Sequence, residues 1–185
     1  METQTNAPLG QEVLAALRQR CSVRAYTDED IPDKTIEAVI EAGLLSAAGR
    51  GIRPWELIVV RDPETLRSLA AMRKEGSARM LEGANAAIVV IAKEDAADTW
   101  IEDCSIVMAN MHLAADALGL GSCWIQGRMR YAAEGVTTCD YVAELLGIPE
   151  GYQLEATLSL GFPASHKPTR TVDETLRAKV HYERF

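Results

Sequence analysis

The segment Arg20-Cys21-Ser22-Val23-Arg24 carries two arginines and a hydroxyl at alternating positions. Side chains i, i+2 and i+4 of an extended chain lie on one side of the backbone. An extended segment would therefore project Arg20, Ser22 and Arg24 together. Guanidinium groups are planar, permanently charged donors that suit phosphate or carboxylate groups. The spacing indicates an anion site, although short basic clusters also occur on solvated turns.

Glycine and basic residues gather at three further places, each in an expected loop or at the end of an expected strand. These places are residues 49–54, Gln126-Gly127 and Lys167-Pro168-Thr169-Arg170. Glycine lets the backbone approach a flat ligand closely, and loops on a rigid scaffold commonly carry binding groups. Two basic clusters so far apart in sequence can meet on one phosphate only through the fold.

The elements that must position these residues follow from apolar patterning. Strands are expected at residues 55–61, 86–92, 122–126 and 152–162. Helices are expected to end near Arg20, to begin with Pro32 and Pro63 at their first positions, and to span residues 140–146. Helices dominate and strands are few, which predicts a single α+β domain over residues 1–185.

The long apolar helix near the middle of the chain has the clearest start signal. Thr99 and Glu102 match a capping box, in which the threonine side chain and the glutamate satisfy each other's backbone N–H groups. The apolar pattern continues to Leu118, and Gly119 can end the helix. The width of the pattern predicts a central helix buried on several sides.

Composition narrows the class of protein. The chain has 185 residues with 48% hydrophobic and 25% charged residues, as in ordinary globular domains. A net charge of −8 argues against nucleic-acid binding, and no apolar run reaches the ~20 residues that span a bilayer. Residues 1–11 show no secretory signal. The four cysteines form no CxxC pair and the histidines no metal-ligand spacing, which favours a cytoplasmic protein with no metal.

Several short motifs then follow one another in a specific order. They are Arg20-Cys-Ser-Val-Arg24, Ile31-Pro32 opening a helix, Ile52-Arg53-Pro54-Trp55 opening a strand, Gly119-Leu-Gly-Ser-Cys-Trp-Ile125, Leu146-Gly-Ile-Pro-Glu-Gly151, Leu160-Gly-Phe-Pro163 and Val180-His-Tyr-Glu-Arg184. Each motif is weak alone. In this order the chain resembles the nitroreductase family of FMN-dependent flavoproteins from about residue 17 to its end.

The resemblance implies a small, mostly antiparallel sheet flanked by helices, in an intertwined homodimer with FMN at the subunit interface. Residues 163–185 would form an arm that reaches the partner subunit. NADH or NADPH would pass hydride to flavin N5, and a small acceptor such as a nitroaromatic or a quinone would then take it in ping-pong turnover. No side chain is expected to be catalytic. The implied cofactor-binding residues are Arg20, Cys21, Ser22, Arg24, Gly51, Arg53, Pro54, Ile125, Gln126, Gly127, Lys167 and Arg170.

The resemblance also implies roles for some of these residues. Arg20 and Ser22 would hold the phosphate and ribityl end, and Arg24 would lie near the pyrimidine edge, where positive charge stabilises the reduced flavin. Lys167 and Arg170 would return to the phosphate.

The strand-end residues Ile125, Gln126 and Gly127 would pass along the flavin, with the backbone N–H of Gln126 facing N5. The chain also departs from the family pattern, with Gly51 where many members have asparagine and Arg53 where many have glutamine. Gly51 leaves only backbone to contact the flavin ring, and Arg53 supplies a cation in its place.

Other readings stay open. Cys21 is neutral where many members carry a basic residue or histidine, so substrate choice and redox potential are not fixed by the resemblance. A specialised member, such as an ene-reductase, a dehalogenase or a flavin-fragmenting enzyme, usually needs added lid segments. Residues 72–83 are the only obvious lid candidate, which favours a generic reductase. A non-catalytic flavin-binding or sensor protein is the alternative from another class.

Some conspicuous side chains have structural explanations. Cys104 and Cys123 stand in apolar runs and are expected to be core thiols. Trp100 and Trp124 are expected to pack in the core in preference to lining a substrate pocket. His112, on the long apolar helix, is expected to be hydrogen-bonded within the fold.

Overall fold

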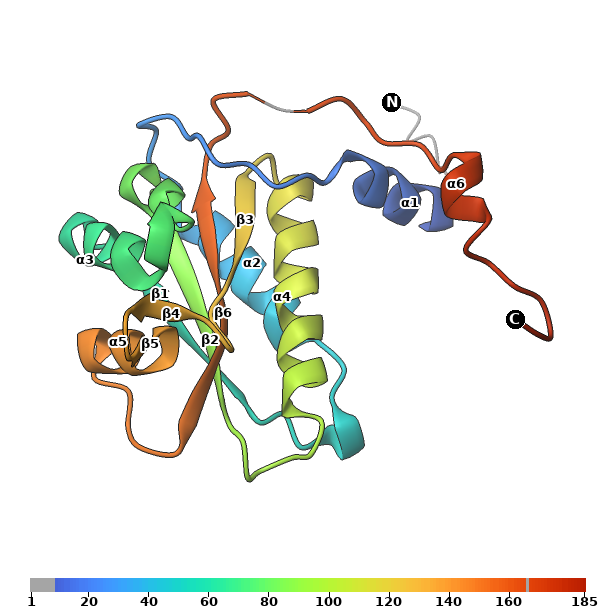
Figure 1. Cartoon of the computed structure of the whole chain (residues 1–185). Helices are drawn as coiled ribbons and strands as arrows, with labels where there is room; N and C mark the ends of the chain where they lie inside the picture. The colour runs from blue at the N-terminus through green and yellow to red at the C-terminus, as the bar shows by residue number, and fades with distance from the viewer. Residues whose placement is uncertain (1–8, 166) are drawn as a thin grey trace.

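The computed structural model of the chain describes residues 9–165 and 167–185. Four strands form one antiparallel sheet in the order β1-β2-β6-β3 (Figure 1). Their bounds are Trp55–Val60 for β1, Ala86–Lys93 for β2, Gly121–Gln126 for β3 and Tyr152–Gly161 for β6. All four predicted strands are present within one residue of their expected ends.

Helices cover both faces of the sheet, which is the layering of an α+β fold (Figure 1). The larger helices are α1 Leu9–Gln19, α2 Asp33–Leu44, α3 Pro63–Leu69, α4 Trp100–Ala117 and α5 Thr138–Leu146. Short elements complete the chain: η1 Gly49–Gly51, η2 Ala70–Met72, η3 Lys74–Gly76, η4 Arg79–Gly83, β4 Tyr131–Ala133, β5 Val136–Thr137 and α6 Glu174–Arg177. The sequence patterns did not predict the β4–β5 hairpin or α6.

Strand β2 divides the core into two apolar clusters, because successive side chains point to opposite faces of the sheet. Ile88 and Val90 pack with residues of α2 and α4. Ala87, Val89 and Ile91 pack with residues of α3 and α5. Both faces of the central strands are therefore covered, which explains why β2 is an uninterrupted apolar run.

The helix starts differ in how well the sequence predicted them. Asp62 caps α3 as expected, because its side chain accepts a hydrogen bond from the backbone N–H of Thr65 at 2.8 Å. Pro32 is the residue before α2, one position earlier than predicted. The capping box at Thr99 was wrong. Its backbone is not extended (φ −99°, ψ 17°), as a side-chain cap requires, and its hydroxyl donates instead to Asp103 Oδ2 at 3.2 Å.

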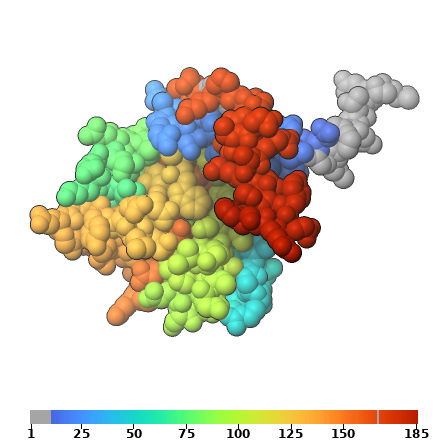
Figure 2. All heavy atoms as spheres, turned by 45° about the vertical axis from the view of Figure 1, so that its right-hand side comes forward, coloured from blue at the N-terminus to red at the C-terminus, as the bar shows by residue number. Residues whose placement is uncertain are grey.

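The two ends of the described chain lie together, away from α3 and α5 (Figure 1). Helix α1 projects from the body, and α6 lies beside it. Figure 2, turned to bring this side forward, shows the C-terminal residues at the surface. No helix among the described residues is long and apolar enough to cross a membrane. Residues 1–8, on which the absence of a secretory signal partly rests, lie outside the described range.

Candidate functional site

The arginine segment runs along the edge strand β3. Ser22 forms a parallel bridge with Ser122, and the backbone N–H of Val23 donates to the Ser122 carbonyl at 2.9 Å. Gly121 permits this approach, because a Cβ there would lie 2.7 Å from Val23 Cγ1. Burial alternates along the segment: Cys21 and Val23 are buried, and the residues between and beside them are not. The segment is therefore extended at Ser22, which is the conformation that alternating side chains need in order to share one side.

Arg20 is turned toward helix α4. Its Nη1 lies 2.6 Å from Nε2 of His112, whose Nδ1 is hydrogen-bonded to the Ser122 hydroxyl. Burial and, to a smaller extent, the charge of Arg20 together lower the pKa of His112 to about 4. A neutral imidazole thus supports the guanidinium, which confirms the expected structural role of His112. Arg20 itself is not among the residues that line either cavity described below.

A cavity of about 260 Å³ lies beside this segment. It is lined by Cys21, Ser22, Val23, Arg24, Ala25, Ser165 and Lys167. The C-terminal segment thus returns to the N-terminal arginines. Arg170 completes the return: its Nη2 donates to the Arg20 carbonyl at 2.9 Å, and its backbone N–H donates to the Arg18 carbonyl at 2.9 Å. The fold brings together the two basic clusters that are far apart in sequence.

A larger cavity of about 620 Å³ lies at the end of β3. It is lined by Arg24, Arg73, Ser77, Met80, Ile101, Ser105, Cys123, Trp124, Ile125, Gln126, Arg128, Met129, Arg130 and Glu155. Arg24 lines both cavities, and Ile125 and Gln126, which the resemblance assigns to the flavin, line the larger one. Gly127 lines neither of the two. Trp124 is half-buried: it packs against the core, as expected, and also lines the cavity, whereas Trp100 is buried.

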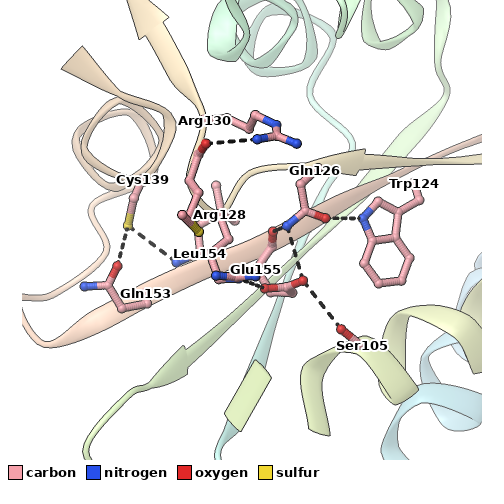
Figure 3. A network of polar contacts seen from close by, with 10 residues as sticks. Ser105, Trp124, Gln126, Arg128, Arg130, Cys139, Gln153, Leu154 and Glu155 are labelled. Atoms are coloured by element: carbon pink, nitrogen blue, oxygen red, sulfur yellow. Dashed lines mark hydrogen bonds and ion pairs between the residues drawn. The ribbon is translucent and has the colours of Figure 1, made fainter. Parts of the chain in front are cut away.

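A hydrogen-bonded network around Glu155 forms one wall of this cavity (Figure 3). The Glu155 side chain is 4% exposed and accepts from Arg128 Nε at 3.1 Å. Gln126 Nε2 donates to Glu155 Oε1 at 3.3 Å, and Trp124 Nε1 donates to Gln126 Oε1 at 2.8 Å. The network fixes the side chain of Gln126 at the strand end.

Sequence reasoning missed four charged residues of this cavity, namely Arg73, Arg128, Arg130 and Glu155. A signal existed for Glu155, because it is the one acidic residue within the apolar run of β6. A buried carboxylate usually has a cationic partner. The sequence does not identify Arg128 as that partner.

The predicted residues of the 49–54 loop lie elsewhere. The backbone N–H of Gly49 donates to Asp103 Oδ1 at 2.8 Å, near the start of α4. The loop thus meets α4 at Asp103, whereas Arg20 meets the same helix at His112. These two positions are nine residues apart, about 13 Å along the helix. Gly51, Arg53 and Pro54 line neither cavity, so a single chain does not bring them to the arginine segment. Arg53 has a positive φ of 53°, a strained backbone for a non-glycine residue.

The thiols belong to the core, as expected. Burial raises the pKa of Cys104 to about 12 and also raises the pKa of Cys123. Both side chains are buried. Neither has the depressed pKa that a reactive thiolate requires.

The antiparallel sheet, its helical layers and the cation-lined cavities at its edge define the class of structure, and comparison with known proteins identifies it as a nitroreductase fold. The solved structure of an FMN-dependent nitroreductase from Clostridium difficile superposes with a TM-score of 0.90 at 36% identity, over 93% of this chain and 99% of that one. A provisionally named nitroreductase from Desulfovibrio desulfuricans, solved in complex with FMN, gives 0.75 at 29% identity, over 98% and 99%.

Sequence comparison gives the same result. A provisionally named NADH dehydrogenase/NAD(P)H nitroreductase from Archaeoglobus fulgidus is 34% identical over 185 residues, which cover 95% of this chain and 99% of that protein. A sequence model of the nitroreductase family matches residues 17–75 and 68–162. The chain belongs to the nitroreductase family.

Proposed function

We propose that this protein is an FMN-dependent oxidoreductase that takes hydride from NADH or NADPH and passes it to a small acceptor. The observation that carries the proposal is the position of Arg24, which lines both a small cation-rich cavity and a larger cavity along β3. A mononucleotide flavin has this division, with a phosphate at one end and a ring at the other. The FMN named in the solved relatives supports the same assignment.

The residues around the smaller cavity suit a phosphate. Ser22 offers a hydroxyl, and Arg24 and Lys167 offer cations in a chain whose net charge is −8. Arg170 holds the Arg20 carbonyl, so the two basic segments are fixed relative to each other. We expect Ser22, Lys167 and the neighbouring arginines to bind the phosphate end of FMN.

The end of strand β3 suits the ring end. When bound, FMN supplies the hydride chemistry, and the protein supplies orientation and electrostatics. Arg24 places positive charge where the ring would gain electrons. The Glu155 network holds the Gln126 side chain, so that Gln126 can lie against a flat ligand at the wall of the larger cavity. The acceptor would be a nitroaromatic, a quinone or a related small molecule.

A homodimer is part of this proposal. The loop with Gly51 and Arg53 is predicted to bind cofactor yet lines neither cavity of its own chain, so it would serve the site of a second copy. Apolar side chains are also left exposed at the ends of the chain: Val13 (56%) on α1, and Val180 (59%) and Tyr182 (85%) near the C-terminus. Covering apolar surface is favourable by about 25 cal/mol per Å².

The cytoplasm is the proposed location. Cys104, Cys123 and Cys139 carry free thiols in the structure, which suits a reducing compartment.

The purified protein tests the proposal directly. We expect a yellow protein that releases FMN, and not FAD, on denaturation. Anaerobic stopped-flow mixing with NADH or NADPH should bleach the flavin, and addition of a quinone or nitroaromatic should restore the colour. A protein without flavin affinity would contradict the proposal. A bound flavin that neither nucleotide bleaches would instead identify a non-catalytic flavin-binding protein.

A further inference from the structure

Arginines dominate the charge of the larger cavity. Arg24, Arg73, Arg128 and Arg130 line it, and Glu155 is the one acidic residue among the lining residues described. The concentration is unusual because the whole chain has 27 acidic and 19 basic residues. Two of the four cations are already accounted for. Arg24 is assigned to FMN in the proposed function, and Arg128 is paired with Glu155.

Arg130 stands outside the Arg128–Glu155 pair (Figure 3). Its Nη1 donates to the neighbouring carbonyl of Met129 at 3.1 Å, which leaves most of the five guanidinium donors available. The side chain is exposed on the loop that follows β3. Its donors and charge can therefore reach a molecule that enters the cavity.

Arg73 lines the same cavity from the segment between η2 and η3. Its Nη1 donates to the Gln126 carbonyl at 2.8 Å, which fixes the guanidinium beside the strand end. Burial lowers the pKa of Arg73, and the charge of Arg130 lowers it further, while Glu75 opposes both effects. The two guanidiniums are thus close enough to repel each other. Like charges held together at a cavity wall favour a bound anion, which offsets the repulsion.

We infer that Arg73 and Arg130 form a binding site for an oxyanion carried by a substrate of the flavin, either the electron donor or the acceptor. The inference rests on the proposed function, because it concerns the molecule that exchanges electrons with the flavin. Carboxylate and phosphate groups share the required chemistry, a planar or tetrahedral oxyanion that accepts several guanidinium hydrogen bonds. The source of the anion is either a carboxylate on an aromatic acceptor or the additional phosphate that distinguishes NADPH from NADH.

Matched substrate pairs separate these sources. The variants are Arg73→Gln and Arg130→Gln, with Arg67→Gln on the exposed face of α3 as the control. For a carboxylate site, either variant should raise the KM for 4-nitrobenzoate relative to nitrobenzene by about tenfold, the effect of losing one charged hydrogen bond. For a phosphate site, the KM for NADPH relative to NADH should rise by a similar factor. Arg67→Gln should change neither ratio.

Equilibrium binding supplies a readout that does not depend on turnover. Calorimetric titration of the purified protein with benzoate and with 2′-AMP, a phosphate probe without the nicotinamide, should show saturable binding of at least one. Arg73→Gln and Arg130→Gln should weaken it, and added salt should weaken it in the wild type. Arg73→Lys should retain part of the affinity because it keeps the charge.

Failure of the anion site is distinguishable from failure of the proposed function. If NADH bleaches the flavin but both KM ratios and both titrations match the wild type in the variants, the anion site is wrong and the oxidoreductase stands. If the protein holds no flavin, the proposed function is wrong, and the titrations still decide whether the arginines bind an oxyanion.

Discussion

Arg20 donates a hydrogen bond to Nε2 of His112 across 2.6 Å, and this contact defines the protonation of the histidine. A guanidinium can only donate, so Nε2 must be the accepting nitrogen. The imidazole proton therefore lies on Nδ1, which donates to the Ser122 hydroxyl. The neutral ring joins α4, β3 and the arginine segment.

Stability should fall as pH is lowered from about 6.5 toward 4. The pKa of His112 is about 4 in the folded protein and 6.5 ordinarily, so between these values the unfolded chain binds more protons. Linkage then removes about 2 kcal/mol of unfolding free energy between pH 7 and about pH 5. Urea unfolding at both pH values measures this difference. His112→Gln should show a smaller drop over the same interval, and an unchanged drop would contradict the assignment.

Arg20 and Arg24 should differ in their effects on FMN. Arg20 would have to turn from His112 to reach the phosphate of bound FMN. If it does, Arg20→Ala should weaken FMN binding by ~1.5–3 kcal/mol, the range for a charged hydrogen bond, with little change in the potential of bound flavin. Arg24→Ala should make the flavin harder to reduce, because Arg24 also lines the larger cavity. Arg24→Lys should recover part of the potential. The FMN dissociation constant and midpoint potential, measured on the same proteins, check this. Two variants that shift affinity alone would refute the division of roles.

The Arg128–Glu155 pair should be asymmetric. The Glu155 side chain is 4% exposed and that of Arg128 is 34% exposed, so only the arginine can turn to water when its partner is removed. Arg128→Gln should cost about 3 kcal/mol of unfolding free energy, because it leaves a buried carboxylate without its cation. Glu155→Gln should cost less, about 1–2 kcal/mol. Urea unfolding of both variants and the double variant gives the coupling. Equal costs for the two single variants would argue against this explanation.

Removing residues 176–185 should reduce both dimer content and FMN occupancy. Exposed apolar side chains in this segment, including Leu176 (48%) and Val180 (59%), would be covered by a partner subunit. Light scattering after size-exclusion chromatography measures the assembly, and visible absorbance measures the flavin. A tail with Lys179 and Arg184 changed to glutamine keeps the apolar residues and serves as the control. A truncated protein that stays dimeric and fully yellow would show that the arm is dispensable.

Local signals predicted much of the fold. Apolar runs located the four strands, and Asp62 before Pro63 located the start of α3, because both depend on neighbouring residues. Thr99 misled for the same reason. The residue types at Thr99 and Glu102 suit a capping box, but the hydroxyl of Thr99 donates instead to the buried side chain of Asp103. The Thr99 hydroxyl could bond either the backbone of its own helix start or Asp103, and the packing that buries Asp103 against Gly49 favours the second.

The residues of the candidate site also divide into those with a local sequence signal and those placed only by long-range packing. The alternating arginines and Lys167 were visible as motifs, and their meeting at one small cavity required the fold. Arg73 and Arg130 carried no motif, and only the packing of β4 against η2 and η3 brings them to one cavity. The position of Gly51 away from that cavity likewise follows from tertiary structure, through the contact of Gly49 with Asp103.

The Gly49–Asp103 contact has a genetic consequence if the loop serves a second copy of the chain. Each site would then take Arg24 from one chain and Arg53 from the other. Two inactive proteins, one changed at Arg24 and one at Arg53, would each lack a part that the other retains. Mixed dimers formed on co-expression would contain one site with both defects and one with neither. One of the two sites in each mixed dimer should therefore regain activity.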